Sequence, residues 1–325
     1  MKEKFIGFLI LFLIIIFLFF LSFDSSFFSS KIELTEKNLP QSLFGSLLKE
    51  KEEVITLIAV GDVMLGRSVN AKMRSLNDFT YPFLKTASLL KSADLSFINL
   101  ESPFYSDCPT TNEGMIFCAD PKVTEGLLLA GIDIANLNNN HIRNYGNEGL
   151  NLTQNLLADN KIDFLGPENN FLVKEIRGTK IGFLGFDLTS GYQKDKIIEQ
   201  VAKEKDKVAI LIVSFHWGIE YAPKPSLKQI ELAHQIIDAG ANLILGHHPH
   251  VIQKTEDYHD GQIVYSLGNF VFDQPWSEAT KTGLIGIFTF QEDKLVKSEF
   301  KEIYIQNYSQ PELIEKETTS SAGNP

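Results

Sequence analysis

The sequence has few thiols and no excess of basic residues. Its 325 residues include only two cysteines, and 30 lysines and arginines stand against 41 aspartates and glutamates, a formal net charge of −11. Proteins that bind nucleic acid or anionic lipid usually carry a basic surface, so the composition argues against both partners. The acidic residues are spread along the chain, as expected of a solvated surface. No Gly-x-x-x-x-Gly-Lys loop for ATP occurs, so ATP-driven ligation would require another subunit.

One long apolar run, from Phe5 to Phe23, follows Lys2 and Lys4. The run is long enough to cross a bilayer, and the lysines favour a cytoplasmic N-terminus. A cleaved signal peptide is the alternative, but no Ala-x-Ala-like site follows and the run is long for such a peptide. No cysteine lies near the run, which excludes a lipoprotein anchor. We therefore expect a single-pass protein of the cell membrane with an extracytoplasmic domain.

The two cysteines, Cys108 and Cys118, enclose a short polar loop. An oxidising compartment outside the cytoplasm would let them pair, and the bridge would mainly rigidify the loop. Zinc binding by two cysteines at this spacing is a weaker interpretation. Two free thiols are the remaining alternative.

Apolar, β-rich runs alternate with helical patterns after residue 53. Strands are predicted at 54–60, 94–100, 132–137, 208–215 and 241–245, and helices at 81–93, 121–130, 146–160 and 226–239. A hairpin is predicted around Arg177-Gly178-Thr179, and further strands at 262–270, 283–290 and 295–306. This order indicates one α/β domain with a mixed sheet.

The predicted segments follow one another without an internal repeat. They are a cytoplasmic stub (1–4), a transmembrane anchor (5–23), a juxtamembrane linker (24–52), the α/β domain (53–307) and a disordered tail (308–325).

A histidine-rich turn, Gly246-His-His-Pro-His250, directly follows a predicted strand. Packing does not explain it, because close imidazoles repel one another or lose protons and histidine is not a preferred core residue. Neutral imidazoles that converge on a metal ion resolve this conflict. A lone histidine would more often be structural.

Residues of metal-binding types also follow four other predicted strands, at Asp62, Glu101, Asn140-His141 and His216. The carboxyl ends of strands form the ligand crevice of open α/β sheets. A single Asp or Asn there would more often cap a helix or shape a turn, so the joint pattern carries the inference. Mixed oxygen and nitrogen ligands without a thiolate suit zinc, manganese or iron better than calcium.

Six motifs in order resemble those of CapA-type capsule-synthesis proteins, which are associated with poly-gamma-glutamate capsules. They are Gly61-Asp62-Val-Met-Leu-Gly-Arg67, Asn99-Leu-Glu101, Asn138-Asn-Asn-His141, Ser214-Phe-His-Trp-Gly218, Gly246-His-His-Pro-His250 and Ser266-Leu-Gly-Asn-Phe270. The resemblance runs from about Ile55 to Phe272. That family is similar to calcineurin-like metallophosphoesterases, which implies a four-layer αββα sandwich and a two-metal site. With the mixed ligands above, we expect one or two divalent metals per chain (Mn, Zn or Fe).

The resemblance also implies residue roles. Six positions match metal ligands: Asp62, Glu101 as the bridging carboxylate, Asn140, His216, His248 and His250. His247 replaces His248 if the register differs by one, and the sequence leaves this open. His141 matches the acid beside the ligand asparagine, which would protonate a leaving group.

Three further residues are candidates for substrate binding. Arg67 and Arg143 each lie near a ligand in sequence and would pair with an anionic substrate. A surface salt bridge is the alternative for both. Asn269 follows a strand and is expected to line the pocket.

The chain departs from the phosphoesterase pattern at one position, where Asp62-Val63-Met64 replaces Asp-x-His. Residues two apart near a strand end point to the same side, so position 64 should face the metal that Asp62 binds. A thioether suits zinc or manganese poorly. We therefore expect one tightly held metal per chain and a second that is held weakly.

Two functional hypotheses follow. In the first, the protein is a membrane-anchored metal-dependent hydrolase that acts in the synthesis, export or attachment of a capsule polymer, on an anionic polymer or a phosphoester. In the second, it is a non-catalytic polymer-binding subunit of a membrane-bound capsule synthase. His141 favours the first hypothesis and Met64 the second; fold alone does not decide between them.

Overall fold

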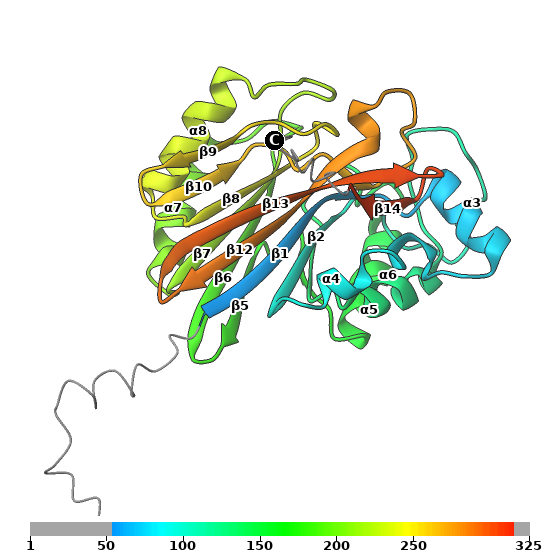
Figure 1. Cartoon of the computed structure of the whole chain (residues 1–325), viewed down its shortest axis with the longest axis horizontal. Helices are drawn as coiled ribbons and strands as arrows, with labels where there is room; N and C mark the ends of the chain where they lie inside the picture. Colours follow the sequence, from blue (N-terminus) through cyan, green and yellow to red (C-terminus); the bar gives the residue numbers. More distant parts are fainter. Residues whose placement is uncertain (1–53, 315–325) are drawn as a thin grey trace, which may run out of the picture. The chain divides into compact units, whose positions relative to one another are not determined.

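The computed structural model describes residues 54–314 (Figure 1). The predicted stub, anchor and linker therefore lie outside the described residues. Within residues 54–314, no helix is both long enough and apolar enough to cross a membrane.

Two β-sheets form the centre of the domain. The strand order of the first is β14-β13-β12-β1-β2-β3-β4, with β11 beside β1, and that of the second is β5-β6-β7-β8-β10-β9. The first sheet consists of β1 (Val54–Val63), β2 (Leu95–Leu100), β3 (Ile134–Asn136), β4 (Asp163–Leu165), β11 (Asn269–Val271), β12 (Thr282–Gln291), β13 (Lys294–Gln306) and β14 (Gln310–Leu313). The second consists of β5 (Phe171–Ile176), β6 (Thr179–Asp187), β7 (Ile210–His216), β8 (Leu243–His247), β9 (Thr255–Tyr258) and β10 (Gly261–Val264).

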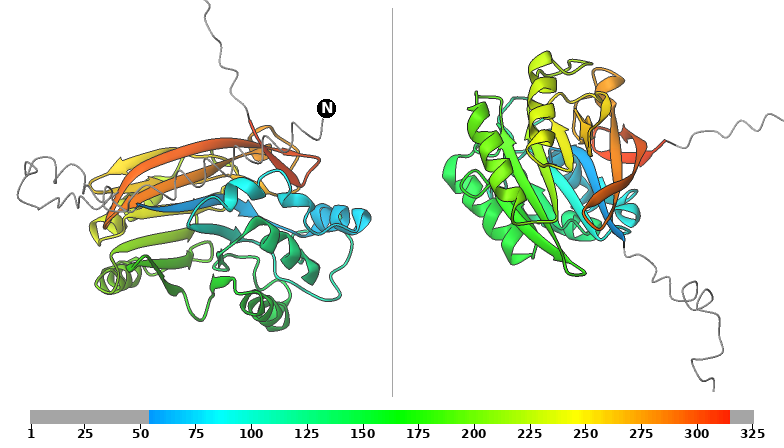
Figure 2. Two further views of the ribbon diagram at one scale, coloured as in Figure 1. Left: turned by 60° about the horizontal axis from the view of Figure 1, so that its bottom comes forward. Right: turned by 90° about the vertical axis from the view of Figure 1, so that its left-hand side faces the viewer.

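The helices cover the outer faces of the two sheets (Figure 2). Side chains of α3 (Arg67–Leu76), α5 (Thr124–Ala130) and α6 (Gly146–Asp159) share a core with the first sheet. Those of α7 (Lys194–Lys205) and α8 (Leu227–Asp238) share a core with the second. The short α4 (Ala87–Leu90) and the 3₁₀ turns η1 (Tyr81–Phe83), η2 (Pro121–Val123) and η3 (Ala279–Lys281) complete the described elements.

A third apolar core joins the two sheets face to face. Along β1, Leu57 and Ala59 point into this core, whereas Ile58 and Val60 point toward the helices of the first sheet. This alternation is the period of a strand that is buried on both faces. Phe97 of β2 and Phe183 of β6 stack across the sheets, with ring centroids 5.9 Å apart. The predicted α/β domain is thus confirmed, but its strands form two sheets, as the family resemblance implies, and not the one mixed sheet that the order of elements suggested.

Three predicted elements differ from the structure. The predicted strand at 262–270 is divided between β10 in the second sheet and β11 in the first. The predicted tail (308–325) begins too early, because β14 pairs antiparallel with β13 and extends the first sheet. Its sequence, Gln310-Pro-Glu-Leu313, shows no alternation, and Pro311 is tolerated only because β14 is an edge strand. The predicted helix at 81–93 is instead η1 followed by the single turn α4, with Pro82 in the first turn of η1.

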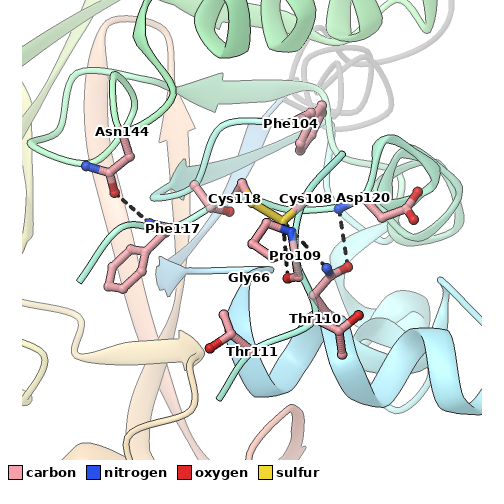
Figure 3. The surroundings of a disulfide bond; sticks show 12 residues. Gly66, Phe104, Cys108, Pro109, Thr110, Thr111, Phe117, Cys118, Asp120 and Asn144 are labelled. Atoms are coloured by element: carbon pink, nitrogen blue, oxygen red, sulfur yellow. Dashed lines mark hydrogen bonds between the residues drawn. A yellow bond between two sulfur atoms is a disulfide. The ribbon is translucent and has the colours of Figure 1, made fainter. Parts of the chain in front are cut away.

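The loop between Cys108 and Cys118 is closed by a disulfide bond and leads toward the interior (Figure 3). Arg74 of α3 holds its start by donating a hydrogen bond to the Cys108 carbonyl oxygen (2.9 Å). At its end, the backbone N–H of Phe117 donates to the Asn144 Oδ1 (2.7 Å). The disulfide therefore fixes a segment that carries Phe117 into the core.

The disulfide makes a direct prediction about thiol reactivity. Full-length protein unfolded in guanidinium without reductant should take up no iodoacetamide, whereas the same sample should take up two equivalents after reduction, as counted by mass spectrometry. Unfolding removes burial as a cause of protection, so only the S–S bond protects the thiols. Two labels without reduction would show free cysteines.

Candidate metal centre

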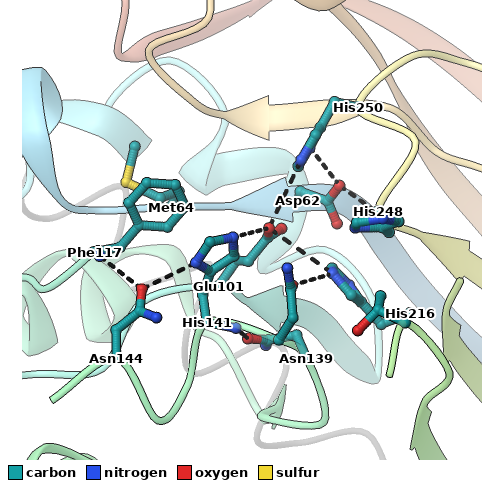
Figure 4. Close-up of polar contacts among 12 residues, drawn as sticks. Asp62, Met64, Glu101, Phe117, Asn139, His141, Asn144, His216, His248 and His250 are labelled. Atoms are coloured by element: carbon teal, nitrogen blue, oxygen red, sulfur yellow. Dashed lines mark hydrogen bonds and ion pairs between the residues drawn. The ribbon is translucent and has the colours of Figure 1, made fainter. Parts of the chain in front are cut away.

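Side chains from the ends of several strands meet where the two sheets adjoin (Figure 4). Asp62 lies in β1, Glu101 directly follows β2, and His216 ends β7. Asn140 and His141 follow β3, and the turn from His248 to His250 follows β8. Parallel pairing brings these strand ends to one edge of each sheet.

Glu101 lies at the middle of the group. Its side chain is fully buried, and neither carboxylate oxygen has a hydrogen-bond partner among the described residues. Oε1 instead faces the Nε2 atoms of His141 (3.9 Å), His216 (3.9 Å) and His250 (3.8 Å). Burial, and next the charge of Asp62, raise the pKa of Glu101 well above its usual value. An unpaired buried carboxylate is costly, and a divalent cation among these nitrogens would satisfy it, so the residues fit a metal.

Asp62, in contrast, is held as an anion by its neighbours. Burial raises its pKa, but hydrogen bonds from His247 and His250 outweigh burial and bring the pKa well below the usual value. Its Oδ1 accepts from the Asn99 amide (2.9 Å), and its Oδ2 accepts from the His248 backbone N–H (3.2 Å). An ionised carboxylate beside Glu101 is the donor that a metal requires.

Burial favours the neutral form of two of the proposed ligands, His216 and His248, and the neutral form is the one that binds a metal. Burial lowers the pKa values of His141 and His248, and lowers that of His216 well below the usual range. The Oδ1 of Asn140, which is exposed at the edge of the group, lies 2.9 Å from His216 Nε2. The Asn140 oxygen and the His216 nitrogen thus lie close enough together to contact one cation in place of each other.

Asn269 sets the orientation of His250. Its amide nitrogen donates to Gln274 Oε1 (3.0 Å) and to the Thr280 carbonyl oxygen (2.9 Å), which assigns Oδ1 as the acceptor for His250 Nδ1 (3.0 Å). The lone pair of His250 is therefore on Nε2, toward Glu101. Asn269 is fully buried, so the expectation that it lines a substrate pocket is replaced by this supporting role.

Asn144 orients His141 in a similar way. The Asn144 Oδ1 lies 2.9 Å from His141 Nδ1 and also accepts the Phe117 N–H. The Phe117 ring stacks on the imidazole, with centroids 4.0 Å apart. These contacts aim the His141 Nε2 at the centre of the group.

The geometry distinguishes between His247 and His248. His247 is fully buried behind Asp62, with its Nδ1 3.2 Å from Asp62 Oδ1. The His248 ring lies beside that of His216, with centroids 4.8 Å apart, and forms part of a possible metal-binding group with His250. His248 therefore faces the centre, and His247 supports Asp62.

The two arginines do not offer free charges to a substrate. Arg143 is on the surface and pairs with Glu168 and Asn147, as the salt-bridge alternative expected. Arg67 is buried, pairs with Asp273, and donates to the Gly114 carbonyl oxygen (2.9 Å). It thereby ties the disulfide loop to the segment after β11.

Met64 does not face the metal group. Strand β1 ends at Val63, so the alternation that was expected to align positions 62 and 64 stops between them. The Met64 sulfur accepts the Gly66 N–H (3.0 Å) in the buried core and points away from the carboxylates (Figure 4).

Sequence reasoning missed three residues of the site. Asn99 donates to Asp62, Asn144 orients His141, and Glu220 is grouped with His248 and His250. Asn99 stands in a quoted motif, only two residues before Glu101. Glu220 and Asn144 lie several residues beyond their strand ends, where no local pattern marks them.

The chain matches known proteins over most of this domain. Residues 56–274 match the family described as bacterial capsule synthesis protein PGA_cap. The chain is 32% identical over 267 residues to the capsule biosynthesis protein CapA of Bacillus anthracis, which covers 73% of this chain and 65% of the relative. It is 28% identical over 257 residues to the PGA biosynthesis protein CapA of Bacillus subtilis, covering 72% and 67% respectively. The match to the B. anthracis relative thus spans slightly less than two thirds of that protein.

Solved structures share the fold at low sequence identity. A phosphatase from Mycoplasma pneumoniae matches with a TM-score of 0.53 and 18% identity, covering 79% of this chain and 96% of that one. A hypothetical protein from Thermus thermophilus matches with a TM-score of 0.51 and 16% identity, covering 76% and 98% respectively. The predicted CapA-type resemblance is confirmed, and the chain belongs to the PGA_cap family of bacterial capsule synthesis proteins.

Proposed function

We propose that this protein is a metal-dependent hydrolase that acts in the synthesis, export or attachment of a capsule polymer of the poly-gamma-glutamate type. Its substrate would be the anionic polymer or a phosphoester. The observation that carries the proposal is the buried Glu101 carboxylate, which has no hydrogen-bond partner among the described residues and faces three imidazole nitrogens.

The ligand set would be Asp62, Glu101, Asn140, His216, His248 and His250. A divalent metal bound there supplies Lewis acidity and an activated water. Neutral imidazoles and an ionised Asp62 are the protonation states that such binding needs.

The protein's own contribution to bond cleavage would be a proton from His141. Asn144 and Phe117 hold the ring so that Nε2 faces the reacting side. Because Nδ1–H donates to Asn144 Oδ1, the proton that reaches the leaving group would be the Nε2 proton of the imidazolium form, and burial, which lowers the pKa of His141, makes that form a stronger acid. A polymer-binding subunit without catalysis is the alternative, and such a subunit has no need of an oriented acid.

The pKa shifts give a prediction for metal binding. Glu101 keeps its proton at pH values where a free glutamate is ionised, so a cation must displace that proton, and affinity should rise with pH. Mn²⁺ should therefore raise the melting temperature of the full-length protein more at pH 7.5 than at pH 5.5. Scans in EDTA at each pH provide the baseline. An equal rise at both pH values would contradict the role of Glu101.

The catalytic role of His141 is tested by substitution. His141→Ala should retain most bound metal but lose turnover by about 100-fold or more, the scale of general acid catalysis. The substrate should be a phosphodiester with an alkyl leaving group, or poly-gamma-glutamate, because nitrophenolate leaves without needing a proton. His234→Ala is the matched control, since His234 lies outside the site and contacts Glu256 and Tyr258. Full activity of His141→Ala would exclude it as the acid.

We also propose that residues 5–23 anchor the protein in the cell membrane, with the domain on the extracytoplasmic side, where it would meet membrane-bound capsule synthase subunits. Full-length protein should remain in the membrane fraction after a high-salt wash, while a chain that starts at Lys51 should be soluble. Recovery of a shortened, soluble native form would show that the apolar run is cleaved.

A further inference from the structure

The loop that follows β7 folds back over the histidine turn. Two backbone hydrogen bonds hold it there: Trp217 N–H to the His247 carbonyl oxygen (3.1 Å) and Tyr221 N–H to the Pro249 carbonyl oxygen (2.8 Å). Gly218 (φ +90°) and Tyr221 (φ +62°) both have left-handed backbone conformations. A non-glycine residue held in that region is more common at functional sites. The loop is therefore built in a fixed position relative to His248 and His250.

This arrangement places Glu220 next to two metal-binding imidazoles. One oxygen of Glu220 and one nitrogen each of His248 and His250 lie within 4.8 Å of one another. Atoms at this separation can contact one cation between them. Asp62, Glu101 and His250 form a second group of the same kind. Because His250 has one lone pair, on Nε2, it can bind only one cation, so a cation held by Glu220, His248 and His250 leaves Asp62 and Glu101 to a neighbouring one.

The negative charge of Glu220 and its neighbouring carboxylates also favours a bound cation. None of the described lysines or arginines forms an ion pair with Glu220. The buried guanidinium of Arg67 is paired with Asp273. Asp62, Glu101 and Glu220 thus all lie beside the histidines, and no lysine or arginine of residues 54–314 forms an ion pair with any of these three carboxylates.

We propose that Glu220 is a metal ligand, and that Glu220, His248 and His250 together hold a second divalent cation beside the one at Asp62 and Glu101. One carboxylate with two imidazoles suits manganese, iron or zinc. The inference rests on the proposed metal centre and adds a ligand outside the matched motifs. Met64 supplies no ligand to the site. Glu220, which follows β7 of the second sheet, would supply one instead. The chain should then retain two metals, rather than the one tight and one weak metal expected from sequence.

The test is a metal count on full-length protein. Wild-type chain, Glu220→Gln and the control Glu168→Gln are loaded with Mn²⁺, dialysed and measured by elemental analysis and by electron paramagnetic resonance. Glu168 is an exposed carboxylate that pairs with Arg143 outside the site. Glu220→Gln should lose one of two equivalents, or bind the second at least about 10-fold more weakly, together with any spectral coupling between two ions. Glu220→His, which restores a ligating nitrogen, should recover part of this binding.

The outcomes separate this inference from the proposed function. Equal metal content and affinity in wild type and Glu220→Gln would overturn the role of Glu220. In that case, loss of metal in Asp62→Asn would show that the centre itself stands. Absence of bound metal in the wild type would overturn both proposals. Melting temperatures in EDTA verify that each variant is folded.

Discussion

The unpaired carboxylate of Glu101 is the constraint on which the site depends. A group this deeply buried normally has hydrogen-bond partners, yet both oxygens lack one within the described part of the chain, and Oε1 faces three imidazole nitrogens instead. Asp62 lies nearby and is well satisfied by Asn99, His247 and His248. The contrast between the two carboxylates shows that the fold can satisfy an acid at this position. The unpaired oxygens of Glu101 therefore fit contact with a cation.

Amide side chains hold two of the imidazoles that face Glu101 in place. Asn269 fixes His250 through Nδ1, and Asn144 fixes His141 in the same way. In each case, the amide leaves Nε2 directed at Glu101. Neutral partners suit this task, because further carboxylates behind the histidines would add to an already negative centre.

The disulfide loop links the surface of the domain to this arrangement. The Cys108–Cys118 bond and Arg67 fix a segment whose last part carries Phe117 against His141. Arg67 also lies over the Phe117 ring, 4.6 Å from its centroid, and pairs with Asp273 from the other side of the site. A residue that the motif pattern suggested for substrate binding thus serves to join two loops.

The spacing of apolar residues predicts the α/β domain and most of the residues of metal-binding types, and the family resemblance implies the two-sheet sandwich. The spacing of apolar residues and the ends of strands can both be recognised in short stretches of sequence. The positions of Asp62, Glu101, His216 and His250 after predicted strands therefore indicate a site. Only the tertiary structure decided which side chains support them. Glu220, Asn144 and the pairing of Arg67 depend on loops that meet across the two sheets. Met64 lies outside the site because β1 ends one residue before it. Strand β14 forms because the edge of β13 is free to pair with it. Such outcomes depend on contacts between distant segments, which no local pattern in the sequence specifies.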